Sequence, residues 1–103
     1  MLEQVKARCG IAVPVYDKEI SGYIEDCLEE MASSGVPRHL LNGENSRVLT
    51  AVTLYVKAYL GNDRSDTGKY LDLYRKKVFR LTLENDDVEQ EYQSPGEKNG
   101  RDK

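Results

Sequence analysis

Residues 47–60 constrain this chain most, because their apolar side chains do not keep to one face of a helix. The polar positions in this stretch are Arg47, Thr50, Thr53 and Lys57. A helix that is apolar nearly all round is normally buried at the centre of a fold. The sequence therefore predicts a central helix from about Ser46 to Leu60, ended by Gly61, with other helices or other subunits packed around it.

Three further helices are expected around that centre, and no alternating stretch is long enough to require a strand. A short first helix begins at Leu2 and ends before Gly10. Asp17 can cap a second helix that Gly35 ends. Its apolar residues recur every three to four positions, as in a helix with one buried face. They are Ile20, Tyr23, Ile24, Cys27, Leu28 and Met31.

The last helix is expected to follow a cap at Ser65 or Asp66 and to run to about Leu83. Its predicted buried stripe is Tyr70, Leu73, Tyr74, Val78 and Leu81. The prediction is an all-α protein, a compact bundle of about four helices. Residues 35–45, rich in Gly, Pro and Asn, should form a loop with one turn around Pro37 to Leu41, which is too long for a helix-turn-helix motif.

The balance of charge differs between residues 1–83 and residues 84–103. Residues 1–83 carry 12 basic and 11 acidic side chains, whereas residues 84–103 carry 3 and 7. The second segment has only Val88 and Tyr92 as apolar side chains, too few to offset the entropy of ordering it. We predict a helical domain over residues 1–83 and a disordered acidic tail over residues 84–103.

The residue inventory disfavours an enzyme. No phosphate-binding glycine loop is present, and two Cys with one His are too few for a zinc site. A dyad of Cys27 and His39 is disfavoured, since Cys27 lies within an apolar stripe and reactive thiols need partly exposed, electropositive sites. Cys9 and Cys27 are expected to be reduced packing residues. No cofactor is expected, and neither a membrane span nor a secretory signal is visible, which indicates a cytosol-like compartment.

The second helix carries a cluster of acidic side chains, Glu25, Asp26, Glu29 and Glu30. Like charges four residues apart repel each other, and a divalent cation could relieve that repulsion. No calcium-loop motif accompanies them, so a solvated acidic face is favoured over a metal site.

The last helix has the opposite charge. Residues 17–34 hold one basic and six acidic side chains, and residues 64–80 hold six basic and two acidic ones. Copies could therefore join head to tail, with the acidic helix of one facing the basic helix of the next. The alternative is that the two helices are neighbours inside one subunit or face water.

Phe79 and Leu83 lie opposite the predicted buried stripe of the last helix and should be covered. The first helix of the same chain is slightly favoured over a neighbouring subunit as the cover. The candidate subunit-interface residues are Glu25, Asp26, Glu29, Glu30, Arg75, Lys76, Phe79, Arg80 and Leu83.

Four stretches resemble one known family in pattern and order: MLEQVK at residues 1–6, YDKEI at 16–20, LYVKAYLG at 54–61, and KY at 69–70 with Tyr74 beyond it. Over residues 1–83 the chain is similar to the small all-helical head-tail connector proteins of tailed phages and prophages, also described as DNA-packaging or head-completion adaptors.

The resemblance implies a structural protein of the virion neck, assembled in the bacterial cytoplasm, with no catalytic role. Its copies would form a dodecamer-like ring that contacts the portal protein and later neck or tail proteins, while DNA passes through without specific binding. The 35–45 loop and the acidic tail could be docking elements that order on assembly. Two alternatives are a small cytosolic helical protein-interaction or regulatory module and, less favoured because of the loop length and acidic balance, a DNA-binding regulator.

Overall fold

The computed structural model describes residues 1–60 and 66–84, and every regular element within these two ranges is a helix. The predicted all-α fold is thus confirmed for this part of the chain. The helices are α1 (Leu2–Cys9), η1 (Pro14–Tyr16), α2 (Asp17–Ser34), η2 (Arg38–Leu40), α3 (Ser46–Tyr59) and α4 (Thr67–Thr82), where η marks a short 3₁₀ helix. The remainder of the predicted tail, residues 85–103, lies outside the described residues.

Local sequence signals set most of the helix ends. Gly10 and Gly35 end α1 and α2 in the left-handed conformation, with φ of 74° and 108°, which other residues adopt at a cost. The side chain of Asn45 caps α3 by accepting hydrogen bonds from the backbone N–H groups of Arg47 and Val48. The predicted turn in the 35–45 loop is η2.

Two predicted caps are not side-chain caps in the structure. Asp17 is the first residue of α2, and its carboxylate binds the Lys6 ammonium at 2.7 Å instead of a backbone N–H group. This ion pair joins α1 to α2, a longer-range partner that the local pattern did not reveal. Asp66 stands at the cap position of α4 without a side-chain capping bond, and Ser65 lies outside the described residues.

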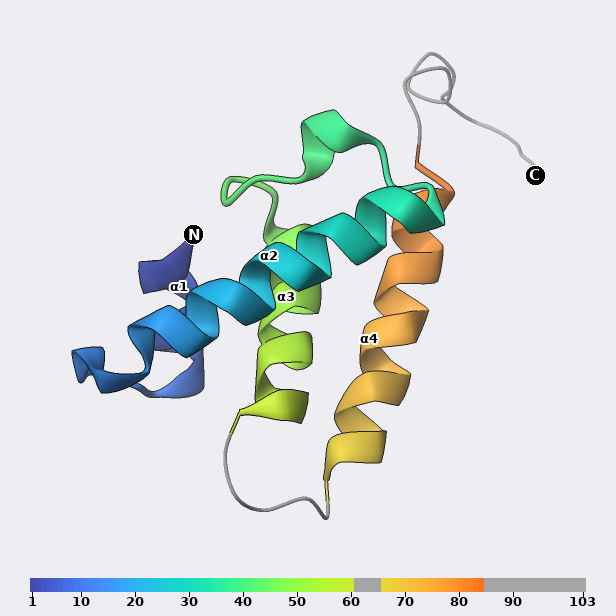
Figure 1. The fold of residues 1–103 in the computed structure, drawn as a ribbon. Helices are drawn as coiled ribbons and strands as arrows, with labels where there is room; N and C mark the ends of the chain where they lie inside the picture. The colour runs from blue at the N-terminus through green and yellow to red at the C-terminus, as the bar shows by residue number, and fades with distance from the viewer. Residues whose placement is uncertain (61–65, 85–103) are drawn as a thin grey trace.

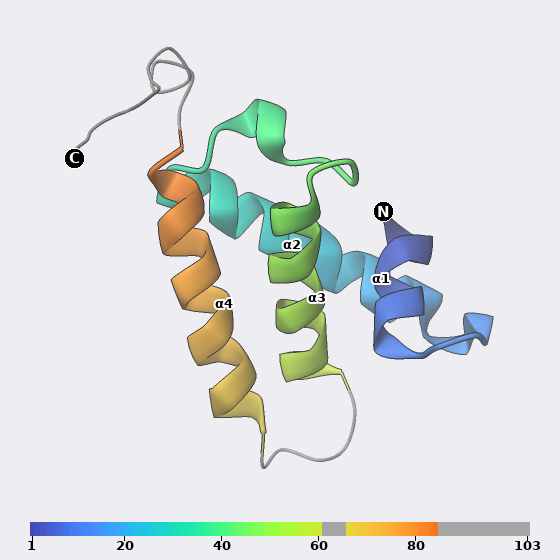
Figure 2. The same ribbon diagram turned by 180° about the vertical axis from the view of Figure 1, so that it is seen from behind.

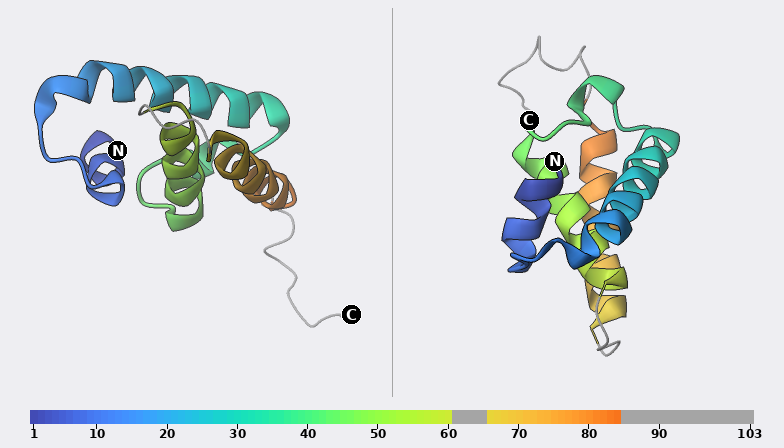
Figure 3. Two further views of the ribbon diagram at one scale, coloured as in Figure 1. Left: turned by 90° about the horizontal axis from the view of Figure 1, so that it is seen from below. Right: turned by 60° about the vertical axis from the view of Figure 1, so that its left-hand side comes forward.

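The helices form two layers. Seen from below, α1, α3 and α4 lie side by side with α3 in the middle, and α2 crosses over them (Figure 3, left). α3 and α4 run in opposite directions, and the opposite side of the molecule again shows α3 between α1 and α4 (Figures 1 and 2). α3 therefore contacts each of the other three α-helices, as its apolar circumference predicts.

The core is one apolar cluster centred on α3. Each long helix supplies a row of buried side chains at helical spacing. Buried residues of α2 and α4 are Ile20, Ile24, Cys27 and Met31, and Tyr74, Val78 and Leu81. Those of α3 are Val48, Leu49, Ala51, Val52, Thr53, Val56 and Ala58.

Leu73 was wrongly included in the buried stripe of α4, since its side chain is 41% exposed. Tyr74, Val78 and Leu81 recur at spacings of four and three and so share one face, whereas Leu73 precedes Tyr74 by one residue, about 100° around the helix. Within residues 1–60 and 66–84, no helix is both long and apolar enough to cross a membrane.

Candidate subunit interface

The outer face of α4 carries two large apolar side chains that nothing in the described chain covers. Phe79 is 64% exposed and Leu83, just after the helix, is 60% exposed. The expectation that α1 covers them is wrong. α1 lies beside α3 on the side away from α4 (Figure 3, left), so it cannot reach this face.

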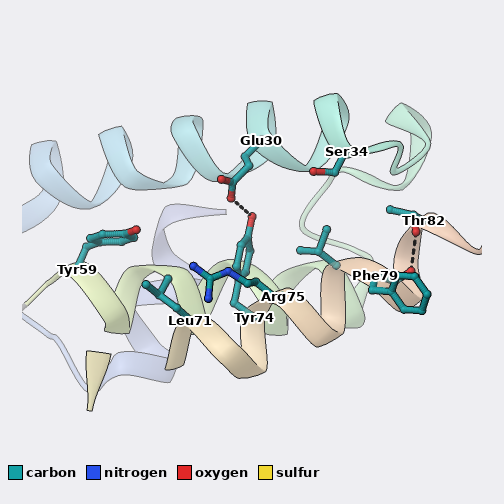
Figure 4. A pocket seen from close by; sticks show the side chains of 9 residues that line it. Glu30, Ser34, Tyr59, Leu71, Tyr74, Arg75, Phe79 and Thr82 are labelled. Carbon is teal, nitrogen blue, oxygen red and sulfur yellow. Dashed lines mark hydrogen bonds between the residues drawn. The ribbon is translucent and has the colours of Figure 1, made fainter. Parts of the chain in front are cut away.

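A groove of about 400 Å³ runs between this face and the second half of α2. Figure 4 shows α2 on one side of the groove and α4 on the other. The lining residues are Glu30 and Ser34 from α2, Tyr59 from α3, and Leu71, Tyr74, Arg75, Val78, Phe79 and Thr82 from α4. A shallower apolar depression beside it is lined by Arg75, Lys76, Phe79, Arg80 and Leu83.

Tyr74 forms the polar floor of the groove. Its hydroxyl donates a hydrogen bond of 2.6 Å to Glu30 Oε1 and accepts a weaker one of 3.7 Å from the Cys27 thiol (Figure 4 shows the first). Its ring stacks edge-on against Tyr55, with 5.2 Å between centroids. Tyr74 thus ties α4 to both α2 and α3.

Burial keeps the groups below the groove protonated. It raises the pKa of the Cys27 thiol to about 12, and the negative charge of Glu30 adds to this, against the lowering effect of the Tyr74 hydrogen bond. The pKa of Tyr74 is raised by burial first and then by donation to Glu30. Cys27 is fully buried in the core and neutral, so it has neither the exposure nor the thiolate character that a nucleophile requires.

The predicted acidic residues lie in two different surroundings. Glu30 borders the groove and binds Tyr74 of the same chain, so the interpretation that α2 and α4 are neighbours in one subunit accounts for it. Glu25, Asp26 and Glu29 are exposed on α2. The described residues contain no cluster of three or more carboxylate, imidazole or thiol groups arranged to hold a metal ion.

The predicted basic residues lie together. Arg75, Lys76 and Arg80 are exposed around Phe79, and Lys76 pairs with Asp72 one turn earlier at 3.3 Å. The ion pairs seen within residues 1–60 and 66–84 join Lys6 to Asp17, Arg47 to Glu84 and Lys76 to Asp72, and none of these three links α2 to α4. The structure therefore brings Glu30, Arg75, Lys76, Phe79, Arg80 and Leu83 to one region, and it leaves the rest of the acidic face apart.

Sequence reasoning missed a second exposed apolar surface. Val13, Val15 and Tyr16 project from η1 and the residue before it, and Val15 is 74% exposed. The signal was the apolar run from Ile11 to Tyr16, interrupted by Pro14, which belongs to no helical stripe. We call Val13, Val15 and Tyr16 the knob.

Comparison with known proteins identifies the family. A family model described as "Phage connector protein" matches residues 1–88, which include all four α-helices and most of the chain. No curated protein and no solved structure matches the chain. A connector is a structural component of a phage particle, which agrees with the expected structural role. The match confirms the resemblance seen in the sequence, and the chain belongs to the phage connector protein family.

Proposed function

We propose that this chain is a head-tail connector of the virion neck, whose copies form a ring between the portal protein and the tail. The observation that carries the proposal is the outer face of α4, where Phe79 and Leu83 stand exposed among basic side chains. Large apolar side chains next to arginine are typical anchors of protein interfaces. Membership of the connector family supports this role and does not favour a small regulatory module.

In the proposed ring, opposite charges meet at each contact between copies. The exposed acidic residues of α2 face the basic residues of α4 in the next copy, and this attraction orients the subunits before the apolar groups meet. Such a contact uses two different surfaces and repeats head to tail, so it closes into a ring when the rotation per subunit permits. The residues assigned to it are Glu25, Asp26, Glu29, Arg75, Lys76, Phe79, Arg80 and Leu83. Glu30, whose carboxylate binds Tyr74 of its own chain, borders the contact from the groove.

DNA passes through the proposed ring without being held by specific contacts. The helical domain is close to neutral, with 12 basic and 11 acidic side chains in residues 1–83. Proteins that bind DNA tightly concentrate basic charge, because neutralising phosphates supplies most of the affinity. The role assigned to the chain is structural, without catalysis or a cofactor.

Deleting the gene in the phage or prophage that encodes the chain tests this function. We expect heads filled with DNA but without attached tails, and a plasmid copy of the gene should restore tailed particles. Mass spectrometry of purified wild-type particles should detect the chain. Normal tailed, infectious particles from the deletion, or purified virions that lack the chain, would contradict the proposal.

A charge reversal tests the assigned contact. Arg80→Glu should weaken the association of copies and of chain with portal, whereas Lys69→Glu should not, since Lys69 is an exposed basic residue of α4 outside both depressions. Sedimentation at two salt concentrations measures this, because screening weakens attraction between exposed charges. Equal association of the two variants would exclude the α4 contact.

A further inference from the structure

The knob is held in a defined position although it lies outside the core. Pro14 fixes the backbone at the start of η1, and the left-handed Gly10 turns the chain out of α1. The ion pair between Lys6 of α1 and Asp17 of α2 links the two helices on either side of this segment, and Lys6 itself is buried. Val15 and the half-exposed Val13 and Tyr16 are therefore presented to solvent on a braced turn.

The groove lies at the opposite end of the same long helix. The knob immediately precedes the first residue of α2, whereas Glu30 and Ser34 of the groove belong to its last two turns. α2 has 18 residues, so the two surfaces are separated by most of a rigid rod of about 27 Å. Figure 1 shows the blue segment before α2 at one end and the orange end of α4 at the other. The knob cannot reach the groove of its own chain.

We propose that the knob of one copy inserts into the groove of the next, beside Phe79. This inference rests on the proposed ring and names the contact that builds it. The knob offers three apolar side chains, and the groove with its neighbouring depression offers Phe79, Leu83 and Val78 as the apolar counterpart. Volumes of several hundred Å³ accommodate side chains of this size.

Charge favours a second copy as the occupant. The knob leads directly into α2, a helix with one basic and six acidic side chains, so its insertion brings an acidic helix toward Arg75, Lys76 and Arg80 around the groove. In the reverse arrangement, with two α4 faces meeting, three basic side chains from each copy would be opposed. The apolar anchors then form the centre of the contact and the charged side chains its rim.

The proposed contact is heterologous, since it joins two different surfaces. A mixture of two variants, each damaged in one of these surfaces, therefore tests it. Val15→Asp damages the knob and leaves the groove intact, whereas Phe79→Asp damages the groove and leaves the knob intact. Both side chains are mostly exposed, so neither change should unfold the chain. Leu73→Asp is the matched control, because Leu73 is an exposed leucine of α4 that lines neither depression.

The experiment is native mass spectrometry of the full chain over a range of concentrations. Wild type and Leu73→Asp should form oligomers beyond the dimer, and each of the two damaged variants alone should associate at least about 30-fold more weakly, as expected for loss of an interface anchor. Mixing the two variants should give a one-to-one heterodimer and nothing larger, since one good knob then meets one good groove. Val15→Ser and Phe79→Ser repeat the test without an added charge, and circular dichroism checks the fold.

Three results would overturn the inference. They are a wild-type chain that stays monomeric up to its solubility limit, a Val15→Asp chain that assembles like wild type, and a mixture of variants without a heterodimer. Assembly lost only in Phe79→Asp would place a different occupant in the groove, such as a second α4 or the acidic C-terminal segment of another copy. None of these results changes the phenotype expected from deleting the gene. The proposed contact can therefore be refuted without refuting the proposed neck function.

Discussion

Replacing Tyr74 with phenylalanine removes the hydroxyl that joins α4 to α2 and leaves the aromatic ring in place. The lost bond is the 2.6 Å donation to Glu30, together with the weak contact from Cys27. Hydrogen bonds to charged groups contribute about 1.5–3 kcal/mol. Glu30 is exposed and water replaces the hydroxyl at its carboxylate, so the lower end applies. The Tyr55 stacking contact at 5.2 Å is retained.

We therefore expect Tyr74→Phe to lower the free energy of unfolding by about 1.5 kcal/mol. For a domain of this size that corresponds to a fall in Tm of roughly 6–12 °C. Urea unfolding followed by circular dichroism measures the change as a shift in midpoint at constant slope. Tyr16→Phe is the control, because it removes a hydroxyl from a half-exposed tyrosine of the knob, remote from α4.

A double-mutant cycle tests whether the Tyr74 hydroxyl stabilises the fold through Glu30. If the hydroxyl acts through Glu30, then Glu30→Ala and Tyr74→Phe together should cost clearly less than the sum of the two single changes. A Tyr74→Phe chain as stable as the Tyr16→Phe control would show that the bond to Glu30 adds nothing to the packing of α4. Additive losses would show that Tyr74 and Glu30 stabilise the fold independently.

Three further changes test other contacts. Asn45→Ala removes the cap of α3 and should cost about 1 kcal/mol in urea unfolding, with Asn45→Asp near wild type. Asp17→Asn leaves the buried Lys6 ammonium without its carboxylate and should cost about 1–3 kcal/mol, and a loss below 0.5 kcal/mol would contradict the structural role of this pair. The raised pKa of Cys27 means that the fold favours the thiol, so stability is fully present below its ordinary value of 9.0 and declines toward pH 12, by up to about 1.4 kcal/mol per pH unit. Cys27→Ala should make the alkaline decline in urea midpoint shallower, and an unchanged decline would assign it to other groups.

The helices could be predicted because their signals are local. The spacing of Ile20, Ile24, Cys27 and Met31 marks the buried face of α2, and each of the four is buried in the structure. The apolar circumference of residues 47–60 likewise predicted the central position of α3. Signals of this kind depend only on helical geometry, so a single sequence is enough to read them.

The relations between helices could not be predicted in the same way. The Tyr74 bond to Glu30 depends on the angle at which α2 crosses α4, and no spacing encodes that angle. Phe79 remains uncovered because α1 packs on the far side of α3, although the sequence allowed it on either side. Asp17 looked like a cap because its competing partner, Lys6, lies in another helix.

Because α1 is short, the position of the knob depends on how firmly α1 is held to the rest of the fold. Eight residues are too few for a helix to persist alone, so α1 is held by Val5 in the core and by side-chain bonds to the α3 side of the fold. These bonds run from Gln4 to the Gly43 carbonyl at 2.9 Å and from Arg8 to Thr50 at 3.1 Å.

When α1 detaches in a local opening, the braced turn after it loses its support while the rest of the bundle persists. A surface that is already rigid before contact loses less conformational entropy on binding. In the proposed contact between copies, the opening free energy of α1, readable from the exchange of its amide protons, therefore contributes to how strongly the knob is bound.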